Sequence, residues 1–177
     1  SGCLSDDAGD ARSAPLDPSI GGASMFQYDI ANTGAVTDIT GVASAAERWT
    51  VDVGGAVGSS PAVVGGVVYV CGGDALYALD ASDGERLWSF DTRGAIYSSP
   101  AVADGIVFVG SRDGRLYAVD ALEGTERWSF EANGGIDTSP TVDGGIVYAA
   151  SRATAGRVYA LNAEDGSKRW SFETSYR

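Results

Sequence analysis

The chain has 177 residues, of which 24 are acidic, 12 are basic and none is histidine, so its formal net charge at pH 7 is −12. This balance provides no basic stripe for a phosphate backbone and excludes nucleic acid as an expected partner. It also removes the side chain that proteins use most often for acid–base catalysis and metal ligation. Lys168 is the single lysine, and such acidic, lysine-poor surfaces are typical of proteins kept hydrated in concentrated salt. An ordinary acidic soluble protein is the plainer alternative.

Residues 1–22 are small, polar and acidic, which predicts a flexible tether because too little apolar surface is present to offset the entropy of ordering. Ser1-Gly2-Cys3 resembles the end of a lipobox, the site at which lipoprotein signal peptides are cleaved. That resemblance implies Cys3 as a lipid attachment site and a location outside the cell, anchored to its surface; a chance Gly-Cys pair is the alternative. Residues 23–46 form an N-terminal extension with a short aromatic patch and a turn.

The remainder, residues 47–177, consists of tandem copies of one pattern. Complete copies cover 54–90, 94–130 and 134–172, and the four tryptophans are 39, 40 and 42 residues apart. A period near forty, with insertions confined to one loop, indicates a repeat architecture.

Each copy predicts four short antiparallel strands. A Ser-Pro or Thr-Ser-Pro segment opens the first strand, where proline is tolerated, and a Gly-Gly or Asp-Gly turn leads to an apolar second strand that suits burial on both faces. A loop, a third strand and a second turn precede the strand that contains tryptophan. Units of this size, without helical periodicity, predict an all-β fold with the blades of a β-propeller.

Residues 47–53 match only the last strand of a copy, so the chain predicts three complete blades and one orphan outer strand. Propellers usually close with ~4–8 blades, and open sheet edges promote aggregation. We therefore expect a partial ring, completed by further blades of a longer array or by association of copies into a homo-oligomer.

The third and fourth strands carry an A-x-D-x-x-x-G-x-x-x-W pattern. It is formed by Ala78, Asp80, Gly84 and Trp88, and it recurs with Asp120 and, in the last copy, with Asn162 in place of aspartate. The pattern resembles the pyrroloquinoline-quinone-like (PQQ-like) repeat, which builds quinoprotein alcohol dehydrogenases, the propeller lipoprotein of the outer-membrane β-barrel assembly machine and many secreted haloarchaeal proteins. The resemblance implies a propeller, and its last group implies a haloarchaeal source.

The repeated residues favour a structural role. A tryptophan on an outer strand can bury its ring against the neighbouring blade and donate its indole N–H to a backbone carbonyl. Glycine permits a turn that side chains oppose, and Asp or Asn can accept a backbone N–H two residues on. We therefore assign inter-blade docking to the four tryptophans and three turn glycines: Trp49, Trp88, Trp128, Trp170, Gly84, Gly124 and Gly166.

The resemblance also raises the hypothesis of a dehydrogenase that holds PQQ against Ca²⁺. Its adjacent-cysteine disulfide is absent here, because Cys3 and Cys71 are far apart; Cys71 is expected to be a small buried hydrophobe. The loop carboxylates Asp74, Asp113 and Asp137 are interpreted as turn or solvated residues. The Ser-Ser pairs at 59–60 and 98–99 have no base to activate them. We therefore predict no catalytic, cofactor-binding or metal-binding residue.

The sequence favours a non-enzymatic, surface-exposed propeller that serves as a scaffold or binding module for other proteins, with a membrane contact only through the lipid. Two alternatives stay open. One is a segment of a PQQ- and Ca²⁺-dependent dehydrogenase, and the other is the extracellular sensor domain of a larger protein.

Overall fold

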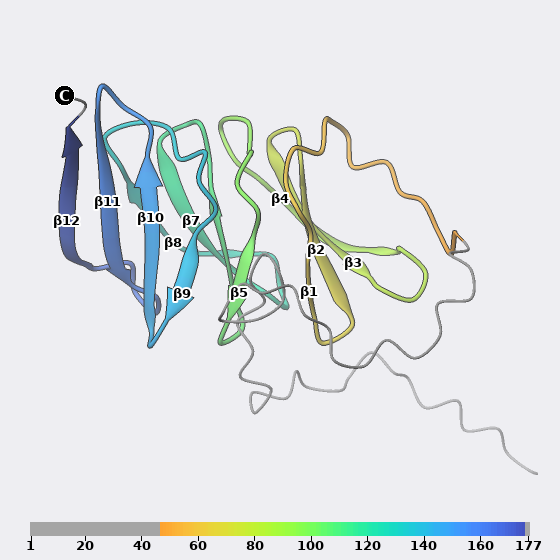
Figure 1. The fold of residues 1–177 in the computed structure, drawn as a ribbon. Helices are drawn as coiled ribbons and strands as arrows, with labels where there is room; N and C mark the ends of the chain where they lie inside the picture. Colours follow the sequence, from red (N-terminus) through yellow and green to blue (C-terminus); the bar gives the residue numbers. More distant parts are fainter. Residues whose placement is uncertain (1–46, 176–177) are drawn as a thin grey trace, which may run out of the picture.

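A computed structural model describes residues 47–175, and these residues form three separate four-stranded antiparallel sheets with no helix. The sheets stand side by side in chain order, as Figure 1 shows. This arrangement confirms the predicted all-β fold with propeller blades. We call the three sheets blade one, blade two and blade three.

Within each blade the strands are hydrogen-bonded in chain order. Blade one contains β1 (Ala62–Val64), β2 (Val67–Gly72), β3 (Ala75–Asp80) and β4 (Arg86–Asp91). Blade two contains β5 (Ala101–Ala103), β6 (Ile106–Gly110), β7 (Arg115–Asp120) and β8 (Glu126–Glu131). Blade three contains β9 (Thr141–Asp143), β10 (Ile146–Ser151), β11 (Ala155–Asn162) and β12 (Lys168–Ser175). The short first strands of neighbouring blades contact one another.

The first two strands of each blade are joined by the predicted tight hairpin. Gly65 and Gly66 have φ values of 58° and 79°, and Asp104 and Gly105 have values of 50° and 73°. Positive φ at both central residues is the requirement of a type I′ turn, whose twist matches that of the flanking strands. The Gly-Gly and Asp-Gly pairs therefore set the register of these hairpins.

The turn after the third strand is held by the predicted side-chain acceptor. Asp80 Oδ1 accepts the backbone N–H of Ser82 at 2.7 Å, and Asp120 Oδ1 accepts that of Leu122 at 2.9 Å. Asn162 Oδ1 accepts the N–H of Glu164 at 3.2 Å, so the asparagine of the last copy makes the same turn. This confirms the prediction that the substitution preserves the structure.

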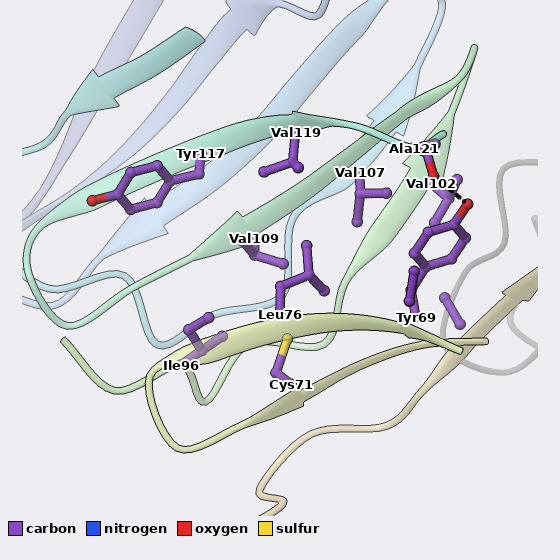
Figure 2. Packing of buried hydrophobic residues seen from close by; sticks show 12 residues of the cluster. Tyr69, Cys71, Leu76, Ile96, Val102, Val107, Val109, Tyr117, Val119 and Ala121 are labelled. Carbon is purple, nitrogen blue, oxygen red and sulfur yellow. Dashed lines mark hydrogen bonds between the residues drawn. The ribbon is translucent and has the colours of Figure 1, made fainter. Parts of the chain in front are cut away.

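The core lies between the blades. One cluster of buried side chains joins blades one and two, and a second joins blades two and three. Figure 2 shows the first, in which Leu76 and Cys71 of blade one meet Val107 and Val109 of blade two. All four are fully buried, and burial of this kind is the main stabilising term of the fold. Cys71 is thus the small buried hydrophobe that its position predicts.

The second strands differ in burial. Every residue of β6 in the middle blade is buried, as a strand covered on both faces should be. In β10 buried residues alternate with partly exposed ones, so the prediction of two buried faces is wrong for blade three. The reason is that no further blade covers its outer face among the described residues.

Residues 47–53 depart from the predicted strand. No ladder joins them to a described strand, because the strands that would complete their blade are not among residues 47–175. Their side chains still pack on blade one, where Trp49 and Val51 contact a small cluster of Val53, Val70 and Leu79.

Candidate functional site

The tryptophans of blades one and two lie against the next blade. Trp88 Nε1 donates to the carbonyl oxygen of Ala121 at 3.1 Å, and Trp128 Nε1 donates to that of Ala163 at 3.0 Å. Each indole ring also lies 5.8 Å from an aromatic ring of its own blade, Tyr69 for Trp88 and Phe108 for Trp128. The rings therefore bridge two blades and satisfy their polar group at the same time.

The turn glycines provide the room for these rings. A Cβ atom on Gly124 would lie 2.6 Å from the Trp88 ring, and one on Gly166 would lie 2.7 Å from the Trp128 ring. Both glycines have positive φ, near 70°. Glycine is therefore required here for the turn and for the close approach of the ring.

The two terminal tryptophans differ. Trp49 Nε1 donates to the carbonyl oxygen of Ala81 at 3.1 Å, and a Cβ on Gly84 would lie 2.7 Å from its ring, so Trp49 occupies on blade one the position of the other docked rings. Trp170 is 47% exposed on the outer face of blade three.

The lipid attachment site predicted at Cys3 lies outside the described residues.

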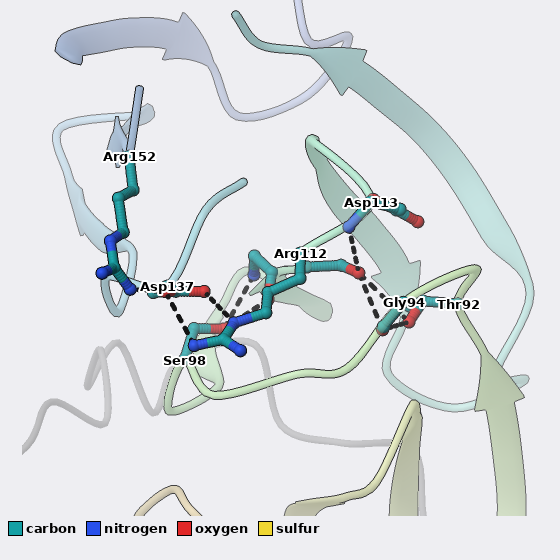
Figure 3. A network of polar contacts seen from close by, with 9 residues as sticks. Thr92, Gly94, Ser98, Arg112, Asp113, Asp137 and Arg152 are labelled. Atoms are coloured by element: carbon teal, nitrogen blue, oxygen red, sulfur yellow. Dashed lines mark hydrogen bonds and ion pairs between the residues drawn. The ribbon is translucent and has the colours of Figure 1, made fainter. Parts of the chain in front are cut away.

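At one end of the blades lie the segments that connect neighbouring blades and the loops that follow each second strand; we call this end the loop face. A polar cluster lies on it. Asp137 accepts from Arg112 Nε at 3.0 Å and from Arg152 Nη1 at 3.3 Å (Figure 3). Arg112 leaves the second strand of blade two, Arg152 leaves that of blade three, and Asp137 lies on the segment that enters blade three. The cluster thus ties two blades together.

The electrostatics of the cluster favour its charged form. Partial burial of Asp137 opposes ionisation, but the hydrogen bonds and charges of Arg112 and Arg152 outweigh it and hold the pKa of Asp137 below its ordinary value. The hydrogen bond to Asp137 raises the pKa of Arg112 in turn. Two guanidinium groups face one carboxylate, so the cluster carries excess positive charge on a strongly acidic chain.

An aromatic ring completes the cluster. The guanidinium carbon of Arg112 lies 4.1 Å from the centre of the Tyr97 ring, in a cation–π contact. Tyr97 is 45% exposed, and the side chains of Arg112 and Arg152 are 47% and 78% exposed. The arginines and the tyrosine are therefore accessible to a partner.

The backbone beneath Arg112 is held from two sides. Arg112 N–H donates to Ala95 O at 3.0 Å, and Ser111 O accepts the N–H of Ile136 at 2.9 Å. Ser111 Oγ donates to Gly94 O at 2.9 Å. Neighbouring segments therefore fix the backbone that carries Arg112.

Asp113 and Asp74, the other loop carboxylates named in the sequence analysis, lie outside the ion pairs of Asp137. Asp113 accepts the N–H groups of Arg93 and Arg115 and the hydroxyl of Tyr117, at 3.1, 2.9 and 2.6 Å. Burial, with the hydrogen bond to Asp113, raises the pKa of Tyr117 to about 12. The side chain of Asp74 is exposed. Asp113 is therefore a turn residue as expected, whereas Asp137 is the centre of an ion-pair cluster and not merely a turn or solvated residue.

The repeated serines link strands and blades. Ser99 Oγ accepts the N–H of Ser60 at 3.0 Å, and Ser139 Oγ accepts the N–H of Ser99 at 2.9 Å, so the segments that enter blades one and two are each joined to the next blade. Ser98 Oγ bonds both the N–H and the carbonyl of Gly110. The hydroxyls of Ser98, Ser99 and Ser139 are thus hydrogen-bonded to backbone, which fits the strand-entry role expected of these serines.

Arg112, Arg152 and Tyr97 are functional candidates that the sequence analysis did not find. The available signal was the Ser-Arg pair that recurs at the end of the second strand in blades two and three. Within residues 47–175 no three His, Cys, Asp or Glu side chains gather as a metal-binding group. The same part of the chain has no helix long and apolar enough to span a bilayer.

Comparison with protein families matches residues 32–175 to the family described as "Outer membrane protein assembly factor BamB". The chain belongs to the BamB family. The repeat is thus the PQQ-like propeller repeat that the sequence pattern resembles. A search of curated protein sequences finds no match.

Two solved quinoprotein enzymes are similar to this BamB-family chain. Quinohemoprotein alcohol dehydrogenase ADHIIG from Pseudomonas putida HK5 is 33% identical with a TM-score of 0.66, over 72% of this chain and 22% of that one. Quinohemoprotein alcohol dehydrogenase from Comamonas testosteroni is 29% identical with a TM-score of 0.62, over 68% and 21%. The chain therefore spans about a fifth of the length of these enzymes.

BamB from Moraxella catarrhalis is also similar, at 25% identity and a TM-score of 0.52. The match covers 71% of this chain and 51% of that one. The shared repeat thus occurs both in enzymes and in an assembly factor.

Proposed function

We propose that this chain is a non-enzymatic propeller scaffold that binds another protein through its loop face. The observation that carries the proposal is the cluster of Arg112, Arg152 and Tyr97 around Asp137, fixed in place and accessible to a partner. Arginine and tyrosine dominate the energetics of protein–protein interfaces. A guanidinium that is already oriented loses little further freedom when it binds.

The charge of the cluster indicates the kind of partner. Arg112 gives Nε and Nη2 to Asp137, which leaves N–H donors of Nη1 without a partner among the described residues. Excess positive charge on a chain of net charge −12 suits a partner segment that presents carboxylates or backbone carbonyls. The name of the matched family, an assembly factor, supports a role in protein–protein association.

Site-specific photo-crosslinking in the native host tests this proposal. A photoreactive residue replaces Tyr97 on the loop face or, as a control, Leu122, which is 72% exposed in the turn between β7 and β8 at the opposite end of blade two. We expect one defined protein adduct from position 97 and none of the same mass from position 122.

Charge reversal sharpens this result. Arg112→Glu with Arg152→Glu should reduce the adduct at least tenfold, because both cations of the cluster are lost. Arg127→Glu is the matched control, since Arg127 pairs with Asp120 at the opposite end of the blade. Equal adducts from both positions, or an adduct that survives charge reversal, would show that the loop face is not the binding surface.

A segment of a quinoprotein dehydrogenase is the second candidate, favoured by the 33% identity to an alcohol dehydrogenase. The described residues do not fit a Ca²⁺ and quinone site, because they bring together no group of three acidic, cysteine or histidine side chains. We therefore assign no reaction step to them. Calorimetric titration with PQQ and Ca²⁺ in high salt tests this candidate, and stoichiometric, Ca²⁺-dependent binding would overturn the scaffold proposal.

The location is a proposal as well. We place the domain outside the cell, held by a lipid on Cys3, because Ser1-Gly2-Cys3 resembles the end of a lipobox and the matched family is described as an outer membrane protein assembly factor. Metabolic labelling with a fatty-acid analogue should mark the unaltered chain and leave the Cys3→Ser variant unmarked. Labelling of both chains would contradict this assignment.

A further inference from the structure

We propose that Asn133 is a site of spontaneous deamidation, which the contact between blades two and three suppresses, and that the product of the reaction weakens this contact. The modification therefore marks chains in which the two blades have separated. Asn133 lies in the connection between β8 and β9 (Figure 1), and the proposal does not depend on the loop-face function.

The sequence supplies the reactive pair. Asn133 is followed by glycine, whereas the other two asparagines, Asn32 and Asn162, are followed by threonine and alanine. Asparagine is among the thermally labile residues, and a following glycine leaves the backbone nitrogen unhindered because it has no side chain. Asn133-Gly134 is thus the pair at which this chain should deamidate first.

The reaction requires only water. The backbone nitrogen of Gly134 loses its proton and attacks the side-chain carbonyl carbon of Asn133, so that a new C–N bond forms. The bond from this carbon to Nδ2 then breaks, and Nδ2 takes up a proton and leaves as ammonia. Water opens the resulting five-membered imide at either carbonyl carbon, which gives aspartate or isoaspartate. No group is oxidised or reduced, and the net change replaces an amide by a carboxylate.

Both reacting groups are open to solvent or free of backbone pairing in the folded chain. Asn133 is exposed, and the N–H of Gly134 has no hydrogen-bond partner among the described residues. Neither burial nor a strand ladder therefore protects the pair. Protection has to come from the hydrogen bonds of the Asn133 side chain.

These hydrogen bonds all lead to blade three. Asn133 Nδ2 donates to Ala155 O at 2.7 Å, and Asn133 Oδ1 accepts the hydroxyl of Tyr159 at 2.9 Å. The hydroxyl of Ser151 donates to Oδ1 too, and the Asn133 N–H donates to the Tyr159 hydroxyl at 3.1 Å. Closure of a five-membered ring takes the side chain out of its staggered conformation. It therefore breaks these bonds and leaves the groups of two buried residues, Ser151 and Tyr159, without this partner.

The corresponding contact between blades one and two contains no such amide. Arg93 occupies the position of Asn133, and Tyr117, the counterpart of Tyr159, donates to Asp113 at 2.6 Å. The reactive group is therefore particular to the second contact, and the first contact supplies matched controls.

Deamidation reverses one of these interactions. In aspartate a negatively charged oxygen replaces Nδ2, so two acceptors would face one another where Nδ2 now donates to Ala155 O. In isoaspartate the main chain runs through the former side chain, which displaces Gly135, whose carbonyl accepts the N–H of Arg152 at 2.6 Å. Either product loosens the contact between blades two and three, and chains that open repeatedly accumulate it.

Mass spectrometry of the complete chain, digested after incubation in mildly alkaline buffer, tests the proposal. We expect the peptide that contains Asn133 to gain the mass difference between an amide and an acid at least tenfold faster in the urea-unfolded chain than in the folded chain. The peptide that contains Asn162 should stay unchanged over the same interval. Isomerisation at Asp-Gly pairs leaves the mass unaltered, so it does not enter this measurement.

Tyr159→Phe distinguishes protection by these hydrogen bonds from protection by folding in general. It removes a hydroxyl that bonds Asn133 twice, and we expect the folded variant to deamidate at least threefold faster than the unaltered chain. Tyr117→Phe is the matched control and should leave the rate unchanged. Circular dichroism establishes that each variant is folded. If Tyr159→Phe does not fold, Ser151→Ala replaces it, with Ser111→Ala as its control.

Asn133→Asp tests the effect of the product. It should unfold at a lower urea concentration than the unaltered chain, whereas Asn162→Asp should not, because the other two copies have aspartate at that position. Equal rates of deamidation in the folded and unfolded chains, or equal rates in the Tyr159 variant and its control, would overturn the proposal. An Asn133→Asp variant as stable as the unaltered chain would overturn it as well.

Discussion

Trp128 and Trp170 occupy the same position in consecutive copies and share the local sequence Arg-Trp-Ser-Phe-Glu, yet their surroundings differ. Trp128 is partly buried against blade three and donates to Ala163, whereas Trp170 is 47% exposed on the last outer face. In a repeat protein, stability is the sum of each unit and its contacts with its neighbours. The comparison shows that the contribution of this tryptophan to stability depends on whether a neighbouring blade packs against it.

The largest effect should come from truncating the internal tryptophan. Trp128→Ala should lower the free energy of unfolding by about 3 kcal/mol, because it removes a large packed ring and leaves a cavity between two blades. Trp170→Ala should lower it by less than about 1 kcal/mol, because half of that ring is already in solvent. Urea denaturation followed by circular dichroism measures both, and equal losses would contradict the comparison.

A smaller effect should follow from adding one methyl group beneath an internal tryptophan. Gly124→Ala should cost about 2–3 kcal/mol, because its φ of +69° strains a side chain and its Cβ would lie 2.6 Å from the Trp88 ring. Gly105→Ala is the matched control, with a φ of +73° and no atom within 4 Å of its Cβ, and it should cost about 1–2 kcal/mol. If the two variants were equally destabilised, close packing of the tryptophan would not be what requires glycine.

The thiol of Cys71 reports how firmly the first internal contact is closed. Burial raises the pKa of Cys71 to about 12, with the Ser59 hydroxyl as a smaller opposing influence. Its thiolate is disfavoured in the folded state, so the thiol should be alkylated at pH 8 at least tenfold more slowly than in the urea-unfolded chain. Iodoacetamide labelling followed by mass spectrometry measures the two rates, and similar rates would show an open interface.

The same shift has a consequence for stability. Because the folded pKa lies above the unfolded value near 9, the stabilisation linked to Cys71 is complete below pH 9 and is lost as the pH rises towards 12. Cys71→Ala should make the decline that begins above pH 9 less steep. Thermal unfolding at successive pH values checks this, and an unchanged decline would assign the effect to other groups.

The smallest effect should concern the loop face, where Asp137 ties blade two to blade three. The pKa of Asp137 is lowered in the folded state, so its contribution is present above the unfolded pKa and is lost as the pH falls through the folded one. Asp137→Asn should therefore flatten the acid limb of the stability curve slightly and leave neutral stability almost unchanged, since both arginines are solvent-exposed. A large loss at neutral pH would indicate a stronger structural role.

Much of the fold could be predicted from the sequence because its signals are local. The Gly65-Gly66 pair favours a type I′ turn, and Asp80 and Asn162 close the turn after the third strand through their own side chains. The strand expected at 47–53 was wrong for a non-local reason, since a strand needs a ladder partner that the described residues do not supply.

The loop-face cluster could not be predicted in the same way. Arg112 and Asp137 are 25 residues apart, on connections of different blades, and blade one has glycine at position 58, where the later copies have Tyr97 and Asp137. The repeat pattern therefore shows these positions as variable loops. Only the angle between neighbouring blades brings the side chains together, and that angle depends on the packing of the entire interface.

The recurring contact between an indole, an alanine carbonyl and a turn glycine has a consequence for the history of such chains. Blade two offers one half of the contact on one face and the other half on its opposite face. Duplication or deletion of one repeat of about forty residues in the gene therefore leaves two compatible faces to be joined. The number of blades can thus change in single steps without the invention of a new interface.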